Sequence, residues 1–139
     1  MKIFIASDHA GFNLKKYIVL KLSKSNKVID LGPKTDRSVD YPIFAKKLSK
    51  KVASNKLNFG ILVCGSGMGM SMAANRTKNA RAALCYSKKN TKLSRLHNNA
   101  NIITLGERLI DKNKAFSLIN IFLSTKFEGG RHLRRIKKI

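Results

Sequence analysis

The apolar residues of this chain fall into short runs separated by longer amphipathic stretches. Five runs have the length of strands: residues 2–7, 28–31, 59–64, 80–85 and 101–105. Short, nearly continuous apolar runs bounded by glycine or polar residues are typical of strands in a parallel sheet, because helices cover such a sheet on both faces.

Between these runs the apolar residues recur at helical spacing. After the first run they stand every fourth residue, and Asp40-Tyr41-Pro42 opens a second helix with a proline in its first turn. Ser87 is a fair N-cap for a later helix, and residues 111–124 form another. The positions expected to face a core are Leu14, Ile18, Leu22, Phe44, Leu48, Val52, Ala115, Leu118, Ile119 and Phe122.

Because strand and helix alternate throughout, we predict an α/β fold. The expected architecture is a three-layer, Rossmann-like sandwich with a five-stranded parallel sheet, formed by residues 1–139 as a single domain. Ligands of such sheets bind where the carboxyl ends of strands meet helix starts.

The third apolar run ends in the most distinctive stretch of the chain. The loop that follows it consists of Gly65, Ser66, Gly67, Met68 and Gly69, and we call it the glycine loop. Alternate glycines allow a sharp turn, and the helix start behind them adds unpaired N–H groups, so the loop is suited to hold an anion. No Gly-Lys-Ser/Thr follows, and a purely structural turn remains the alternative.

Cys64 stands at the entrance of this loop. The positive end of a helix favours a thiolate, which could act as a base. The competing interpretation is that Cys64 is a small buried hydrophobe, as free cysteines often are.

Three further groups of polar residues are candidates for a site. Asp8 and His9 directly follow the first run, although Asp8 could be a helix cap. His97 and Asn98 lie near a helix end, where a histidine could instead interact with the helix dipole.

The third group is basic. Arg131 and Arg135 stand four residues apart and would share a helical face, so they could form a fork for one phosphate, and Arg108 could join them. A solvated basic tail is the alternative. Arg134 lies off that face.

The net charge of +22 is high for a chain of 139 residues. Such a charge ordinarily suggests a nucleic-acid or anionic partner. The lysines are scattered in pairs along the helices and there is no recognisable nucleic-acid module, so we expect no nucleic-acid partner.

Other functional classes are excluded by what the sequence lacks. It contains neither a signal peptide nor an apolar stretch of membrane-spanning length, and its two cysteines end apolar runs. We therefore expect reduced thiols in a cytoplasmic protein without a membrane partner. No cluster of His, Cys and acidic residues has metal-ligand spacing, so we expect no metal and no cofactor.

Taken together, these motifs resemble the type B ribose-5-phosphate isomerase family, which is similar to the galactose-6-phosphate isomerase subunits. The matching stretches are 7–12, 40–42, 61–75, 93–101 and 125–135. The resemblance covers nearly the whole chain, and five motifs in the right order make an accidental match improbable.

The resemblance implies a role for each matched residue. Cys64 would move a proton between C1 and C2 of the sugar, and the glycine loop would hold the enediolate oxygens. One branch of the family uses a downstream Glu as the base, but Met70 occupies that position here. His97 would open the sugar ring. The remaining substrate contacts would come from Asp8 and Asn98, and the phosphate contacts from His9, Arg108, Arg131 and Arg135.

The implied reaction interconverts ribose 5-phosphate and ribulose 5-phosphate. The same chemistry on a six-carbon phosphate, such as allose 6-phosphate or galactose 6-phosphate, is the alternative. The resemblance also implies a homodimer with sites shared between chains. Because the chain ends four residues after Arg135, without the longer tail of many relatives, a tetramer is left open.

Overall fold

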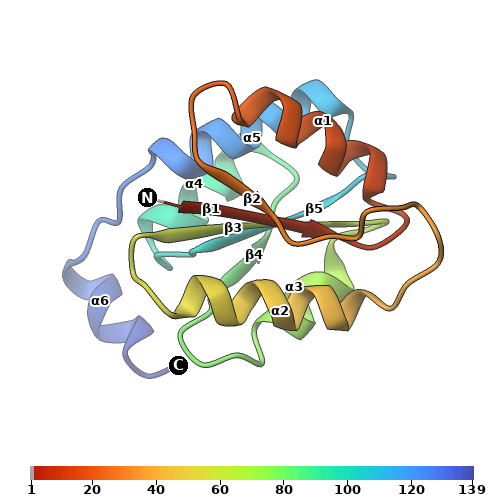
Figure 1. Cartoon of the computed structure of the whole chain (residues 1–139). Helices are drawn as coiled ribbons and strands as arrows, with labels where there is room; N and C mark the ends of the chain where they lie inside the picture. The colour runs from red at the N-terminus through yellow and green to blue at the C-terminus, as the bar shows by residue number, and fades with distance from the viewer. Residues whose placement is uncertain (1) are drawn as a thin grey trace.

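The computed structural model describes residues 2–139 and shows one parallel sheet with helices on both sides (Figure 1). The strands are β1 (Lys2–Ser7), β2 (Val28–Asp30), β3 (Asn58–Cys64), β4 (Ala82–Leu84) and β5 (Ile102–Gly106), and their order in the sheet is β2-β1-β3-β5-β4. The helices are α1 (Phe12–Leu22), α2 (Tyr41–Ala53), α3 (Met68–Ala74), α4 (Lys88–Leu96), α5 (Lys112–Ser124) and α6 (Gly130–Ile136). The predicted α/β class and five-stranded parallel sheet are confirmed.

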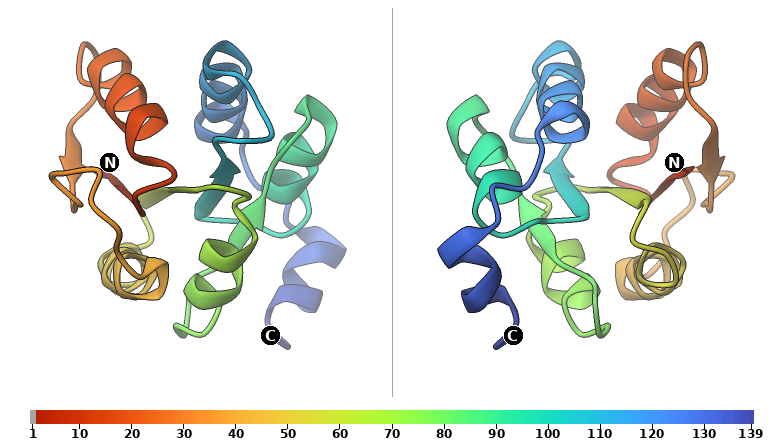
Figure 2. Two further views of the ribbon diagram at one scale, coloured as in Figure 1. Left: turned by 90° about the vertical axis from the view of Figure 1, so that its right-hand side faces the viewer. Right: turned by 90° about the vertical axis from the view of Figure 1, so that its left-hand side faces the viewer.

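The two faces of the sheet pack on different helices (Figures 1 and 2). Because side chains alternate along a strand, Ile61 and Val63 of β3 join the core under α1 and α5, whereas Leu62 and Cys64 join the core over α2 and α3. All four side chains are almost fully buried. This two-sided burial explains why the strands read as continuous apolar runs.

The expected helical stripes are the buried faces of the helices. Ala115, Leu118, Ile119 and Phe122 of α5 have no exposed surface. Asp111 caps this helix by accepting hydrogen bonds from the N–H groups of two following residues. Ser87 caps α4 in a capping box with Asn90, as its sequence position predicts.

The fourth strand is shorter than the predicted run of residues 80–85. Only Ala82–Leu84 pair with β5. Before them, the N–H of Arg81 donates to the side chain of Asn101 at 2.8 Å, and this contact replaces a regular ladder bond. Residues 80 and 85 are buried at the ends of the strand and complete the apolar run.

The C-terminal helix lies apart from the layers. Figure 1 shows α6 beyond the amino ends of the strands, on the side of the sheet where β1 begins, while the loops that follow β1 and β3 lie at the opposite edge. Within α6 the only buried residue is His132. None of the helices in residues 2–139 is both long and apolar enough to cross a membrane.

Candidate active site

The carboxyl ends of β1 and β3 bring Asp8 and Cys64 to one edge of the sheet. β1 pairs with β3 along its whole length, from Lys2 opposite Asn58 to Ser7 opposite Val63. The chain beyond β1 stays attached, because the N–H of Asp8 donates to the carbonyl of Val63 at 3.2 Å. The strand order reverses between β1 and β3, which is where open α/β sheets bind their ligands.

The glycine loop turns the chain from β3 into α3. Gly67 is the N-cap of α3 and has φ of +79°, a conformation that favours glycine. The loop backbone also rests on the end of β5, where a Cβ added to Gly106 would lie 2.7 Å from the backbone of Ser66. These glycines let the loop bend tightly and lie directly on the neighbouring strand.

The sulfur of Cys64 lies within this turn. Its Sγ accepts a hydrogen bond from the N–H of Gly67 at 3.1 Å, and the residue is only 5% exposed. The N–H of Met68 is also occupied, by the hydroxyl of Ser66 at 3.3 Å. Two of the amides expected to hold substrate oxygens therefore have partners within the loop.

Asp8 and His9 lie beside the glycine loop. The carboxylate of Asp8 is buried and accepts the N–H of Gly11 at 2.9 Å, so it does organise the turn before α1, although Gly11 is the helix N-cap. Nδ1 of the exposed His9 lies 3.3 Å from both the N–H and the carbonyl oxygen of Val39, so the backbone can accommodate either tautomer of the ring.

Two side chains from other loops complete this edge. Arg108 follows β5, and its N–H donates to the carbonyl of Gly65 at 3.1 Å. Its guanidinium lies against the same glycine, because a Cβ there would be 3.3 Å from Nη1 of Arg108. The ring of Tyr41, at the start of α2, covers Gly69 in the same way.

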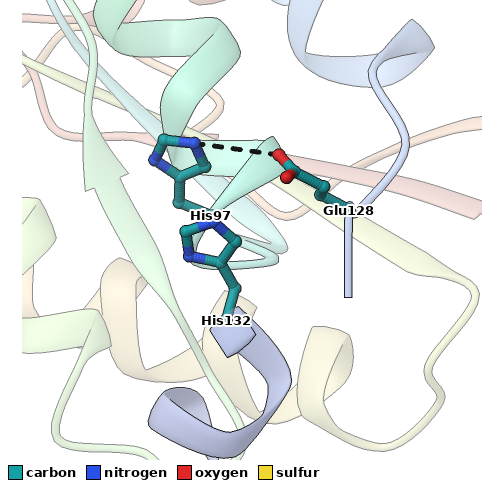
Figure 3. Close-up of side chains that lie close together, drawn as sticks. All are labelled: His97, Glu128 and His132. Atoms are coloured by element: carbon teal, nitrogen blue, oxygen red, sulfur yellow. Dashed lines mark ion pairs between the residues drawn. The ribbon is translucent and has the colours of Figure 1, made fainter. Parts of the chain in front are cut away.

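The other candidate residues gather at the amino edge of the sheet. His97 is the C-cap of α4, and its ring stacks on that of His132, with centroids 4.2 Å apart and planes 9° from parallel. Nε2 of His97 lies 3.9 Å from the carboxylate of Glu128 (Figure 3). Burial and the nearby His97 lower the pKa of His132, so this imidazole is neutral at neutral pH.

A buried arginine holds this second group together. Arg95 donates to the carbonyl of Thr125, which leads into α6, to the side chain of Asn99, and to the carbonyl of Ala100. Its guanidinium also lies over the ring of Phe59, 4.9 Å from the centroid. Arg95 therefore joins the end of α4 to the segment that carries Glu128 and His132.

Two hollows open at this edge. The smaller, of about 270 Å³, is lined by His97, Asn98, His132, Arg135, Ile136 and Ile139. It brings together three residues that the sequence singles out. The larger hollow, of about 640 Å³, lies between α6 and the ends of α2 and α3, and contains none of the candidate site residues.

Within one chain the candidate residues thus form two separate groups. Asp8, His9, Cys64, the glycine loop and Arg108 lie at the carboxyl edge. His97, Asn98 and Arg135 line the hollow at the amino edge, where α6 also carries Arg131. The part of β3 from Gly60, which pairs with the first residue of β5, to Cys64 alone spans about 13 Å. Arg108 therefore lies at the opposite edge from Arg131 and Arg135 within one chain, and a shared phosphate site for the three stays a prediction.

The sequence analysis missed four residues of these groups. Tyr41 lies in a stretch that resembles the family, but no substrate contact is predicted for it from the sequence. No site role is predicted for Arg95, Glu128 or His132. The expectation of no metal-ligand cluster was based on spacing along the chain. In the structure one ligand atom from each of His97, Glu128 and His132 lies within 4.8 Å of the others. Glu128 and His132 stand four residues apart, but His97 lies about 30 residues earlier in the chain, so spacing could not reveal the group of three.

The match of this chain to known proteins covers nearly its whole length. A family model described as Ribose/Galactose Isomerase matches residues 3–139. A Mycoplasma genitalium protein named "Probable ribose-5-phosphate isomerase B" is 47% identical over 140 residues, covering 99% of this chain and 92% of the relative.

Solved structures agree with this match. The Clostridium thermocellum ribose-5-phosphate isomerase B has a TM-score of 0.97 at 44% identity, covering 99% of this chain and 94% of that one. The Mycoplasma genitalium enzyme with bound ribulose-5-phosphate has a TM-score of 0.94 at 46% identity, with 99% and 92% covered. The chain therefore belongs to the ribose/galactose isomerase family.

Proposed function

We propose that this protein interconverts ribose 5-phosphate and ribulose 5-phosphate. Its family membership supports an aldose–ketose isomerisation, and the related Mycoplasma genitalium structure contains bound ribulose-5-phosphate. Such a reaction needs an open-chain sugar, a base that moves one proton, and donors that stabilise an enediolate. The two groups of residues supply these parts.

The observation that carries the proposal is the placement of Cys64. Its sulfur lies at the carboxyl edge of the sheet, in contact with the N–H of Gly67 at 3.1 Å and shielded from solvent. The sulfur therefore lies at the point where the fold binds ligands, which is the position that a proton-transferring base requires. Cys85, by contrast, is buried in the core on the other face of the sheet, and its burial raises the pKa of its thiol.

The reaction begins with a closed sugar ring. His97 protonates the ring oxygen as its bond to C1 breaks, and the C1 hydroxyl loses its proton to solvent, which gives the open-chain aldehyde. The Cys64 thiolate then removes the proton from C2, and the electrons of the C–H bond form the enediolate. Transfer of the hydroxyl proton from O2 to O1, together with return of the carbon-bound proton from Cys64 to C1, gives the ketose and regenerates the thiolate. The glycine loop stabilises the oxygens in between, mainly through amides that have no partner within the loop.

We infer that each site is shared between two chains of a homodimer. The proposed base and ring-opening acid lie at opposite edges of one sheet, so one chain cannot bring them to the same five-carbon sugar. A two-fold partner can place its α6 and His97 over the glycine loop and exclude water. The phosphate would then contact His9 and Arg108 from one chain and Arg131 and Arg135 from the other. Whether such dimers pair into tetramers is a separate question.

The test compares steady-state rates on ribose 5-phosphate, allose 6-phosphate and galactose 6-phosphate, for wild type, Cys64→Ala and the matched variant Cys85→Ala. We expect the highest kcat/KM on the five-carbon substrate and a loss of about 10²–10⁴-fold for Cys64→Ala alone. Preference for a six-carbon phosphate would overturn the substrate assignment, and near-normal activity of Cys64→Ala would overturn the base.

A further inference from the structure

His97, Glu128 and His132 form the cluster that the sequence did not reveal. One nitrogen or oxygen from each lies within 4.8 Å of the others, and all three side chains meet between the end of α4 and the start of α6 (Figure 3). We propose that this cluster binds one divalent transition-metal ion, such as Zn²⁺, and that the bound ion inhibits the enzyme. The inhibition rests on the proposed function; the binding does not.

The ligand chemistry suits such an ion. Two imidazoles and one carboxylate form a known set of three zinc ligands that leaves the fourth position open. Imidazole nitrogen also binds Cu²⁺ and Ni²⁺, whereas Mg²⁺ and Ca²⁺ prefer oxygen ligands. The cluster should therefore select transition metals over the common alkaline-earth ions.

A second observation points to a missing ligand. Nε2 of His132 is fully buried and has no hydrogen-bond partner, while the residue as a whole is 6% exposed. Leaving a buried polar atom without a partner is unfavourable, and such an atom calls for an explanation. A metal ion would supply the partner.

The backbone holds the three residues in place. The N–H of Glu128 donates to the carbonyl of Leu96 at 3.1 Å, directly beside His97, and the N–H of His132 donates to the carbonyl of Gly129 at 3.0 Å. The two rings are nearly parallel, so their lone pairs do not yet converge. Binding requires one ring to turn. His97, whose side chain is 38% exposed, can turn without disturbing the core.

The surrounding charge makes Glu128 decisive. Arg131 and Arg135 lie on the same helix as His132, and their positive charges oppose a cation. Glu128 supplies the one negative charge among the three ligands and lies 3.9 Å from His97. Its removal should weaken binding at least about tenfold, since even loss of an outer-shell partner costs that much.

The binding experiment uses untagged protein stripped of metal with a chelator. Equilibrium dialysis against Zn²⁺, read by atomic absorption, should give one ion per chain for wild type and for Cys64→Ala. Glu128→Gln and His132→Asn should bind at least about tenfold more weakly. Asp36→Asn, which removes one exposed acid from a distant loop, should bind like wild type. Circular dichroism confirms that each variant is folded.

Three results would overturn the site: no stoichiometric binding to wild type, equal affinity in Glu128→Gln and wild type, or loss of binding only in Cys64→Ala, which would place the ion on the thiol. The inhibitory part is tested by activity. Wild-type activity should fall in step with occupancy and return on chelation. Glu128→Gln, relative to its own metal-free rate, should need at least about tenfold more Zn²⁺. Stoichiometric binding that leaves wild-type activity unchanged would refute inhibition alone.

Discussion

At the scale of single residues, the two cysteines show how position decides the chemistry of one side chain. Both are free and buried. Cys64 ends β3 and receives an N–H from Gly67, whereas burial raises the pKa of Cys85 despite hydrogen bonds from Thr91 and Ser94 that oppose the shift. Only a thiolate reacts with iodoacetamide.

We therefore expect iodoacetamide to modify Cys64 and to leave Cys85 unmodified at neutral pH. Because the pKa of Cys85 is raised, its reaction should begin only at a pH higher than that of an ordinary exposed thiol. Peptide mass spectrometry across a pH series measures both rates, with Cys64→Ala reporting Cys85 alone. Substrate should protect Cys64 and preserve activity. Faster modification of Cys85 than of Cys64 would contradict this assignment.

At the scale of elements, a buried ion pair joins α1 to β2. The side chain of Lys15 is almost fully buried, and its Nζ donates to both carboxylate oxygens of Asp30, at 2.9 and 2.7 Å, and to the carbonyl of Pro33 at 2.7 Å. The side chain of Asp30 is 40% exposed. The two partners therefore differ in what their removal leaves behind.

Asp30→Asn leaves a buried ammonium without its counter-charge, whereas Lys15→Met leaves a carboxylate that water can reach. We expect Asp30→Asn to lower the free energy of unfolding by about 3 kcal/mol, the low end for breaking a buried pair, because Asp30 is partly exposed. Lys15→Met should cost less. Urea unfolding of both variants measures the difference, and equal losses would show that hydrogen bonding, not charge burial, dominates.

The second element is α6, whose basic residues fall on different faces. Arg131 and Arg135 are one helical turn apart, and Arg135 lines the hollow with His97. We expect Arg131→Ala and Arg135→Ala each to raise KM by the equivalent of about 1.5–3 kcal/mol, with little change in kcat. Arg134→Ala is the matched control and should do little. Equal effects from all three would indicate a general electrostatic role.

At the scale of the whole molecule, the separation of the two groups makes assembly part of the proposed chemistry. Cys64 lies at the carboxyl edge of the sheet and His97 at the amino edge. Consider a two-fold dimer with shared sites that pairs one Cys64→Ala chain with one His97→Ala chain. One of its two sites then contains both substitutions, and the other site contains neither.

These two variants, inactive alone, should therefore recover activity when they are unfolded and refolded together. Random pairing gives dimers of which half contain one chain of each variant. Each mixed dimer has one intact site out of two, so the mixture should reach ~25% of wild-type activity. Cys64→Ala mixed with Arg108→Ala is the control. Arg108 lies against Gly65 at the same edge, so this pair should gain nothing beyond the activity that Arg108→Ala retains. No recovery in the first mixture would sink the shared-site proposal.

The sequence by itself determined most of the fold. The apolar stripe of α5 repeats at the period of a helix, so it is visible in the sequence. Strands of a parallel sheet are buried on both faces, so β3 appears as the continuous apolar run of residues 59–64. The sequence also identified the glycine loop, because a strand-to-helix turn with φ of +79° at Gly67 requires a residue type that is visible in the sequence.

Only the tertiary structure decided which residues meet. Glu128 and His132 reach His97 because the chain returns past α4, held by Arg95, and no local pattern encodes that return. The structure likewise places Arg108 beside Gly65 and away from Arg131. Secondary structure depends on neighbours along the chain, whereas a site depends on contacts between distant segments, and those follow from how the sheet orders its strands.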